Sequence, residues 1–405
     1  MIARAPYLFL LLILIPDLYF DLHYWRHRLT LGRRIVYWLP SIVLCALTIK
    51  LMYEKNFIPD DPTILYIYLL LIGLIAVPKA VFMLCSITGL GFSHLFHRKK
   101  GASGHSAADC LRPARRKNYG NLVGLLCVPI IWYILLYGSF IGFHGLEVNR
   151  QTYVSPDLPK AFDGYKIVLF SDVHVGSYKG KNQATLARAV DSINAQKADL
   201  IVFTGDLQNA QPQEIYPHLD LLGSLKAKDG VYSVQGNHDY GDYICGNTAR
   251  KTANCRETIS LQRQMGWTVL QNEHRYINRD KSSIVIAGME NDGDGIKFPQ
   301  RGDIKKTLKG IARGSFIVML EHDPSSWKRK IIPDGRTQLT LSGHTHRMQF
   351  AIFGWCPMSV LGREFNDWYT EGKQSLFVTA GLGGLIPFRF GATGEIVVLT
   401  LRSGN

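Results

Sequence analysis

The chain has 405 residues, of which 47% are hydrophobic, and a formal net charge of +14. This length exceeds that of most single cores, so two domains are expected. The seven cysteines form no C-x-x-C pair, which argues against a zinc ribbon or a thioredoxin-like motif. Much of the excess positive charge lies in two loops of the first third, where it favours an anionic membrane surface over nucleic acid as a partner.

Four apolar stretches in this first third predict membrane-spanning helices, at residues 5–19, 35–53, 63–96 and 119–143. The third is interrupted by Pro78 and Lys79, so it predicts either one kinked span or a tight helical pair. The fourth is uncharged and longer than the roughly 20 residues that a bilayer requires. A soluble helical domain would need polar faces at helical spacing, which these stretches lack.

The charges beside these stretches predict their orientation. Basic residues gather in the first and third connecting loops: Arg26, Arg28, Arg33, Arg34, Arg98, Lys99, Lys100, Arg112, Arg115, Arg116 and Lys117. In the second loop, Glu54, Asp60 and Asp61 outnumber Lys55. Because basic loops stay in the cytoplasm, the chain after about residue 145 is expected on the outer face of the inner or plasma membrane. Two crossings by residues 63–96 would reverse this assignment.

The remaining chain alternates apolar runs with segments of helical periodicity. We expect a transmembrane region at residues 1–144, a linker with a first strand at 145–164, and a second domain at 165–405, which the motifs described below predict to be catalytic. Helices are predicted at residues 182–196, 214–225 and 257–265. Cys245 and Cys255 fall in one polar loop, and the sequence leaves open whether they form a disulfide.

Five apolar runs in this domain each end in a carboxylate, an amide or an imidazole. Short buried strands are predicted from such runs, and the polar residues then lie where each strand ends. The motifs, in chain order, are Asp172-x-His174, Gly205-Asp206, Gly236-Asn237-His238-Asp239, His322 and Gly343-His344-Thr345-His346. Since ligands gather at the carboxyl ends of strands in open α/β sheets, the motifs predict a metal site built from strand ends.

This series of motifs resembles the calcineurin-like metallophosphoesterase superfamily over residues 165–402. The resemblance implies an α/β fold, a two-sheet sandwich flanked by helices, here preceded by an all-α transmembrane region. It also implies two divalent metal ions. The first would be held by Asp172, His174 and His346, the second by Asn237, His322 and His344, with Asp206 bridging the two.

The residue types suit such a centre for physical reasons as well. Two adjacent divalent cations, about 3.5–4 Å apart, polarise a phosphoryl oxygen and deprotonate a bridging water. Imidazole and oxygen ligands suit manganese, iron or zinc better than magnesium. His238 resembles the family's catalytic histidine, which would protonate the leaving oxygen, and Asp239 is expected to orient its imidazole. Singly, each residue is more often a turn former, a helix cap or an ordinary loop residue.

The C-terminal segment Gly381-Leu382-Gly383-Gly384, followed by Pro387-Phe388-Arg389-Phe390, resembles the membrane-linked YkuE/YaeI-like branch of this superfamily. A substrate-binding role for Arg389 is one interpretation. The alternative is a glycine turn between two strands, in which Arg389 pairs with Glu395.

Together these features predict a membrane-anchored metal-dependent phosphoric ester hydrolase. It would cleave a phosphodiester or phosphomonoester by attack of metal-bound hydroxide, and its tether to the bilayer favours a lipid-linked or cell-envelope substrate. A first alternative is a cytoplasmic-face pyrophosphohydrolase of a nucleotide-linked lipid. A second is a membrane receptor or scaffold whose metal site only binds. Nucleic acid is not expected as a partner, and the sequence does not specify the oligomeric state.

Overall fold

The computed structural model describes residues 5–54, 59, 62–100, 117–244, 246–295 and 298–404, with residues 94–100 described by their backbone only. Several residues used above lie outside these ranges: Lys55, Asp60, Asp61, Arg112, Arg115, Arg116 and Cys245. The possible Cys245–Cys255 pair is therefore not described. The chain divides into two compact units, residues 1–137 and 138–405.

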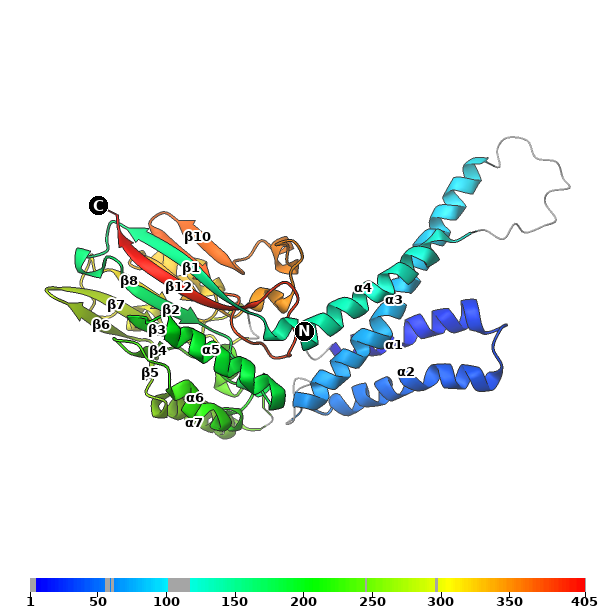
Figure 1. Ribbon diagram of the computed structural model, residues 1–405, viewed down its shortest axis with the longest axis horizontal. Helices are drawn as coiled ribbons and strands as arrows, with labels where there is room; N and C mark the ends of the chain where they lie inside the picture. The colour runs from blue at the N-terminus through cyan, green and yellow to red at the C-terminus, as the bar shows by residue number, and fades with distance from the viewer. Residues whose placement is uncertain are drawn as a thin grey trace. The chain divides into compact units, whose positions relative to one another are not determined.

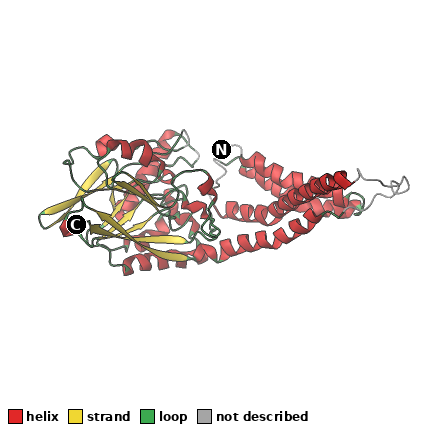
Figure 2. Ribbon diagram, turned by 90° about the horizontal axis from the view of Figure 1, so that it is seen from above, coloured by secondary structure: helices red, strands yellow, loops and turns green. Residues whose placement is uncertain are grey.

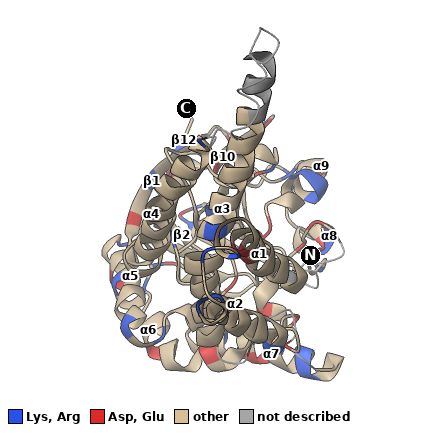
Figure 3. Ribbon diagram, turned by 90° about the vertical axis from the view of Figure 1, so that its right-hand side faces the viewer, with Lys and Arg blue, Asp and Glu red and all other residues tan. Residues whose placement is uncertain are grey.

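The first unit is helical. Its elements are α1 (Ala5–Phe20), α2 (Leu31–Leu51), α3 (Pro62–Lys100) and most of α4 (Tyr119–Phe140). All four helices belong to stretches long and apolar enough to cross a membrane, and α4, which has no charged residue, is tan throughout in Figure 3. The segment with Pro78 is one continuous helix, α3, and contains a single candidate span, so the alternative of a helical pair is wrong.

The helices of this unit pack through small and apolar residues. Ile13, Leu44 and Tyr68 belong to a buried cluster shared by α1, α2 and α3. The approach of α3 and α4 depends on glycine, because a Cβ added to Gly120 would lie 1.9 Å from the carbonyl oxygen of Cys85. Small residues at helix contacts are typical of membrane helices. The apolar side chains left exposed on these helices are those that a bilayer would cover.

The second unit contains two six-stranded sheets, seen as the stacked strands of Figure 2. In sheet A the order is β1 (Leu146–Ser155), β12 (Gly394–Ser403), β2 (Lys166–Phe170), β3 (Leu200–Phe203), β4 (Val231–Ser233) and β5 (Thr268–Val269). In sheet B it is β10 (Asp367–Glu371), β11 (Gln374–Val378), β9 (Leu339–Ser342), β8 (Ile317–Leu320), β7 (Ser282–Gly288) and β6 (Glu273–Arg279). Each sheet contains four neighbouring parallel strands. In sheet A these are β2, β3, β4 and β5, and in sheet B they are β7, β8, β9 and β11.

Successive side chains of a strand point to opposite faces of its sheet. One set therefore lies in the core between the two sheets, and the other set lies under the helices. On β2, Ile167 and Leu169 pack between the two sheets, whereas Val168 and Phe170 face the helical layer. This layer consists of α5 (Gln183–Ala195), α6 (Leu219–Gly223) and α7 (Thr248–Gln264), which cover sheet A in Figure 1. The outer face of sheet B packs against α8 (Ile304–Thr307) and α9 (Ile332–Asp334). The predicted α/β sandwich preceded by apolar helices is confirmed.

Two helices differ from the expected elements. The helix predicted at residues 214–225 is broken into two 3-10 turns and the short α6, because Pro217 cannot continue a regular helix. In contrast, α7 begins nine residues earlier than predicted, at Thr248, where the side chain of Asn247 accepts a hydrogen bond from the Arg250 backbone nitrogen. The first strand expected within residues 145–164 is β1, which pairs with β12 along its whole length.

Candidate metal centre

The predicted ligands lie at the carboxyl ends of parallel strands from both sheets. Asp172 and His174 follow β2, Asp206 follows β3, Asn237 and His238 follow β4, His322 follows β8, and His344 and His346 follow β9. Both sheets present these ends at one edge of the unit. Side chains separated by up to 174 positions of sequence therefore meet in one place.

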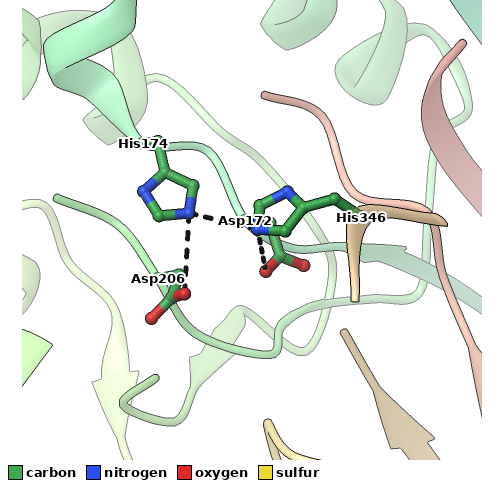
Figure 4. A group of neighbouring side chains, drawn as sticks. All are labelled: Asp172, His174, Asp206 and His346. Atoms are coloured by element: carbon green, nitrogen blue, oxygen red, sulfur yellow. Dashed lines mark hydrogen bonds and ion pairs between the residues drawn. The ribbon is translucent and has the colours of Figure 1, made fainter. Parts of the chain in front are cut away.

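A first group of four side chains converges in Figure 4. One ligand atom from each of Asp172, His174, Asp206 and His346 lies within 4.8 Å of the others. The Nε2 atoms of His174 and His346 are 3.3 Å apart. The Nε2 of His346 is 3.4 Å from Oδ1 of Asp172, and that of His174 is 3.5 Å from Oδ2 of Asp206.

A second group shares Asp206 with the first and adds His322 and His344. Oδ2 of Asp206, which faces His174, is also 3.2 Å from Nε2 of His322. The other carboxylate oxygen, Oδ1, accepts a hydrogen bond from the backbone nitrogen of His238 at 2.8 Å. The amide oxygen of Asn237 lies 3.1 Å from His322 Nε2, and Nδ1 of His344 is at the same distance from that atom. One oxygen of Asp206 therefore belongs to both groups.

The chemistry of these atoms fits metal ions. Imidazole nitrogens face one another and also face carboxylate oxygens. Hydrogen bonds cannot pair all of these atoms at once, whereas a cation bound among them would be stabilised by all of them. The charges within the site also favour a bound cation. Burial would lower the pKa of His322, but the carboxylate of Asp206 outweighs it and raises this pKa to about 10. The carboxylates thus favour a positive charge between them, which a bound metal would supply. Thiolates take no part in either group.

The two imidazoles of the first group have pKa values shifted in the opposite direction. The pKa of His174 lies well below its ordinary value because of burial and the neighbouring His238. Burial also lowers the pKa of His346. A neutral imidazole keeps a lone pair available for a metal, so these two rings are suited to act as ligands.

Five of the candidate ligands have a left-handed backbone. The φ angles are 53° at Asp172, 49° at His174, 61° at Asp206, 75° at His344 and 50° at His346. Only a few per cent of residues other than glycine adopt positive φ, and such residues gather at functional sites. Each loop therefore turns sharply at its ligand, which directs the side chain back over the strand ends.

Groups behind the ligands fix their orientation. Nδ1 of His322 lies 2.7 Å from the carbonyl oxygen of Thr204, and Nδ1 of His346 lies 3.4 Å from that of Gly383. The amide nitrogen of Asn237 donates to the hydroxyl of Tyr243 at 2.8 Å, which turns the amide oxygen toward His322. Such contacts set the tautomer and direction of metal-binding side chains.

His238 lies beside the first group. Its ring centroid is 4.8 Å from that of His174, and the ring stacks on Tyr243 at 3.9 Å with the planes 3° apart. Its Nδ1 lies 2.5 Å from the carbonyl oxygen of Asn209, so Nε2 is the nitrogen left for other partners. Tyr243 and Asn209 were missed as site residues, because nothing in the sequence of their loops distinguishes them.

The expected contact between Asp239 and the His238 imidazole is wrong. The buried carboxylate of Asp239 instead accepts hydrogen bonds from the backbone nitrogens of Asp206, Leu207 and Gln208, at 3.0, 3.0 and 3.3 Å, and from that of Gly236 at 2.9 Å. Asp239 therefore fixes the loop that carries Asp206, and the carbonyl of Asn209 orients His238.

The surroundings of Arg389 match neither the substrate-binding role nor the pairing with Glu395 that the sequence suggested. The residue is fully buried, and its guanidinium donates to five carbonyl oxygens, those of Ala380, Gly381, Gly383, Ala392 and Thr393. An arginine held in this way does not face a substrate. It also forms no ion pair with Glu395, which accepts hydrogen bonds from Thr379 and Ala380. Arg389 thus organises the glycine-rich loop that backs Asp172 and His346.

A cavity of about 310 Å³ opens beside the second group. It is lined by His344 and Asp323, whose Nε2 and Oδ2 atoms are 3.5 Å apart, and by residues of the segment after β9. Its cations are paired: Lys328 with Glu364, and Arg363 with Asp294. The cavity provides room next to the candidate centre for a group larger than phosphate.

A two-sheet α/β sandwich with this site at its strand ends, joined to apolar helices, defines a membrane-associated metallophosphoesterase. Residues 165–348 match the family model of the calcineurin-like phosphoesterases, and residues 2–143 match that of the transmembrane domain of a probable calcineurin-like phosphoesterase. The chain belongs to the calcineurin-like phosphoesterase family, as the resemblance in the sequence predicted.

Relatives with curated sequences place it among membrane-linked members. It is 33% identical to the metallophosphoesterase YkuE of Bacillus subtilis over 278 residues, which is 66% of this chain and 90% of YkuE. It is 29% identical to a transmembrane protein with metallophosphoesterase domain of Danio rerio, over 60% of this chain but only 55% of that protein. A dimetal phosphatase of Danio rerio matches in structure with 11% identity and a TM-score of 0.35, over 59% of this chain and 99% of the other, a likeness too distant to assign a function.

Proposed function

We propose that this protein hydrolyses a phosphodiester or phosphomonoester at a dinuclear metal centre, in a catalytic domain formed by residues 165–405. The observation that carries the proposal is the convergence of six candidate ligands in two groups that share one oxygen of Asp206, with the amide oxygen of a seventh, Asn237, 3.1 Å from His322 Nε2. When bound, two divalent cations would polarise the phosphoryl group and lower the pKa of a water molecule.

The residues of the chain have distinct roles in this proposal. Asp172, His174 and His346 would hold the first cation. Asn237, His322 and His344 would hold the second, and Asp206 would contribute to both. Manganese, iron or zinc fits this donor set. The carbonyl of Asn209 occupies Nδ1 of His238, so Nε2 is the atom that would give a proton to the leaving oxygen. Tyr243 keeps the ring in position by stacking on it.

The apolar helices support a proposal for the class of substrate. A domain tied to the bilayer by apolar helices meets bilayer-resident phosphate esters at high effective concentration. Lipid-linked or cell-envelope substrates on the outer face are therefore proposed, and the cavity beside His344 offers space for the part of the substrate beyond the phosphate.

Two single substitutions test the chemistry in the purified full-length chain. Asp206→Asn should abolish hydrolysis of both a nitrophenyl and an alkyl phosphodiester in manganese, iron or zinc. His238→Ala should lower kcat for the alkyl ester by about 10²–10⁴-fold but affect the nitrophenyl ester much less, because nitrophenolate leaves without a proton. His274→Ala, a histidine outside both metal groups, is the matched control and should retain activity. A wild type as inert as Asp206→Asn under every metal would refute the proposal.

A further inference from the structure

The segment after the last metal-binding motif exposes an unusual number of large apolar side chains. Among the described residues 145–404, nine such side chains are exposed, and six of them lie between residues 348 and 361: Met348, Ile352, Phe353, Trp355, Val360 and Leu361. The other three, Val154, Tyr216 and Tyr276, lie apart from one another in sequence. Exposed apolar residues scattered singly need no explanation, but a concentration of this kind marks an interaction surface.

The centre of this apolar segment is a tight turn with an aromatic tip. The backbone nitrogens of Ile352 and Trp355 each donate to the carbonyl oxygen of the other, at 2.9 Å. Between them, Phe353 and Gly354 have φ angles of 49° and 83°, as in a two-residue hairpin turn. Turns of this type favour asparagine or glycine, yet the first position is a fully exposed phenylalanine. A phenylalanine in a strained, solvent-facing position has no stabilising role within the unit itself.

Hydrogen bonds join this turn to the end of the last apolar helix. The backbone nitrogen of Ala351 donates to the carbonyl of Phe390 at 2.7 Å, and that of Arg389 donates to the carbonyl of Gly138, in α4, at 3.0 Å. The Phe388 ring packs so closely on Gly138 that a Cβ there would lie 2.2 Å from it. All these residues belong to the second unit. Along this path Phe353 lies within roughly 20 Å of Gly138.

The same end of α4 belongs to a stretch that is apolar enough to span a membrane, residues 119–144. Phe140 and Ile141, just beyond Gly138, are themselves more than half exposed. Hydrogen bonds therefore fix the turn close to the end of a candidate membrane span. The guanidinium of Arg347 donates to the carbonyl of Gly354 at 3.1 Å, which places a positive charge directly beside the aromatic tip.

We propose that residues 348–361 form a second membrane contact, in which Phe353 and Trp355 enter the interface of the bilayer that α4 crosses. Aromatic and aliphatic side chains flanked by arginine are the chemistry that this interface accepts, because rings enter the acyl boundary while the guanidinium meets lipid phosphate. The bilayer is favoured over a protein partner because backbone hydrogen bonds join this apolar segment to the end of α4, a candidate membrane-spanning helix. The contact would hold the strand ends at His344 and His346 near the lipid headgroups.

Photocrosslinking in native membranes tests this contact without any measurement of activity. A benzophenone analogue of phenylalanine replaces Phe353 in the full-length chain, and the same analogue replaces Tyr276 as control. Tyr276 is an exposed aromatic residue on β6, at the opposite edge of sheet B from β10. Irradiation at position 353 should give adducts with the mass of a phospholipid, at least about fivefold more than at position 276. Should the chain altered at 353 not accumulate, Leu361 is a second position with the same expectation.

The other outcomes overturn the proposal. Equal lipid labelling at both positions would mean that the segment has no special access to the bilayer. Crosslinks from position 353 to a second copy of this chain, or to another protein, would identify the apolar segment as a protein interface. Absence of any adduct at 353 and 361 would show that the segment remains in water.

Discussion

The carboxylate of Asp239 accepts a hydrogen bond from the backbone nitrogen of Asp206 at 3.0 Å, across 33 positions of sequence. This contact is one of three through which the buried carboxylate holds the loop of Asp206, and a fourth, from Gly236, closes the turn of Asp239 itself. Asp239→Asn replaces one of the two acceptor oxygens by an amide nitrogen, which cannot accept a hydrogen bond, so the buried backbone N–H groups that faced this oxygen lose their partner. We expect the free energy of unfolding to fall by about 2 kcal/mol or more, with a matching loss of bound metal. Thermal unfolding and metal analysis measure both effects.

The control for this prediction is Asp242→Asn, three residues further along the chain. Asp242 pairs with Lys251 at 3.1 Å, and both side chains are partly exposed. Exposed pairs contribute about 0–1 kcal/mol, so this variant should resemble the wild type. Equal destabilisation by the two substitutions would contradict the role assigned to Asp239.

Arg389→Met should weaken metal binding although Arg389 lies outside both metal groups. The substitution leaves five carbonyl oxygens without their donor, including that of Gly383, which also faces Nδ1 of His346. Loss of a contact that orients a ligand typically costs 10–100-fold in metal affinity, and we expect about that loss in a metal titration. Arg402→Met, which removes an exposed ion pair with Asp163, is the control. Metal affinity unchanged in Arg389→Met would exclude this positioning role.

Removal of metal by a chelator should lower the thermal unfolding midpoint. A ligand present at about 100 times its Kd stabilises the folded state by about 2.7 kcal/mol. For a unit of this size that energy corresponds to a shift of roughly 5–10 °C. Addition of manganese, iron or zinc should restore the midpoint, whereas Asp206→Asn should respond neither to the chelator nor to metal. A wild-type midpoint insensitive to chelation would argue against a bound cation.

The distribution of basic residues predicts that the C-terminus lies on the outer face. Reporters fused after Asn405 should be active if they require export and silent if they require the cytoplasm. A fusion after Lys117, which follows the second basic loop, should give the reverse pattern. Cytoplasmic activity of the full-length fusion would favour the alternative of a cytoplasmic-face pyrophosphohydrolase.

In the helical unit, we expect the ion pair between Lys79 and Asp17 to be required for stable folding. The Nζ of Lys79 lies 2.6 Å from the fully buried carboxylate of Asp17, which also accepts from the hydroxyl groups of Tyr37 and Ser41. Lys79→Met leaves a buried charge without its partner, a change that costs about 3–5 kcal/mol. We expect much less full-length protein in the membrane, and partial recovery when Asp17→Asn is added. Lys50→Met, at an exposed position of α2, should accumulate normally; equal loss in both lysine variants would contradict the prediction.

Much of the fold and site was predictable because buried parallel strands have a simple signature. Short apolar runs such as Ile317–Leu320 are buried on both faces, and the polar residue that follows each of them marks the end of the strand. Parallel neighbours bring these ends together, so the positions of Asp206 and His322 follow from the pattern.

The details that were missed depend on contacts between distant segments. The acceptor role of Asp239 requires the turn after β3 to lie above the turn after β4, which no local pattern indicates. Tyr243 is one aromatic residue in a polar loop until its ring is seen to stack on His238. The continuity of α3 was left open because proline ends most soluble helices, whereas neighbouring membrane helices and local backbone adjustment accommodate it in a bilayer.

The shared carboxylate has a mechanical consequence. Asp206 comes from sheet A and His322 from sheet B, and their side chains meet at 3.2 Å. A cation bound between them would therefore link the two sheets. Movement of one sheet relative to the other would separate the two ligands and release the ion. Loss of metal would then report a shear between the two layers well before the chain as a whole unfolds.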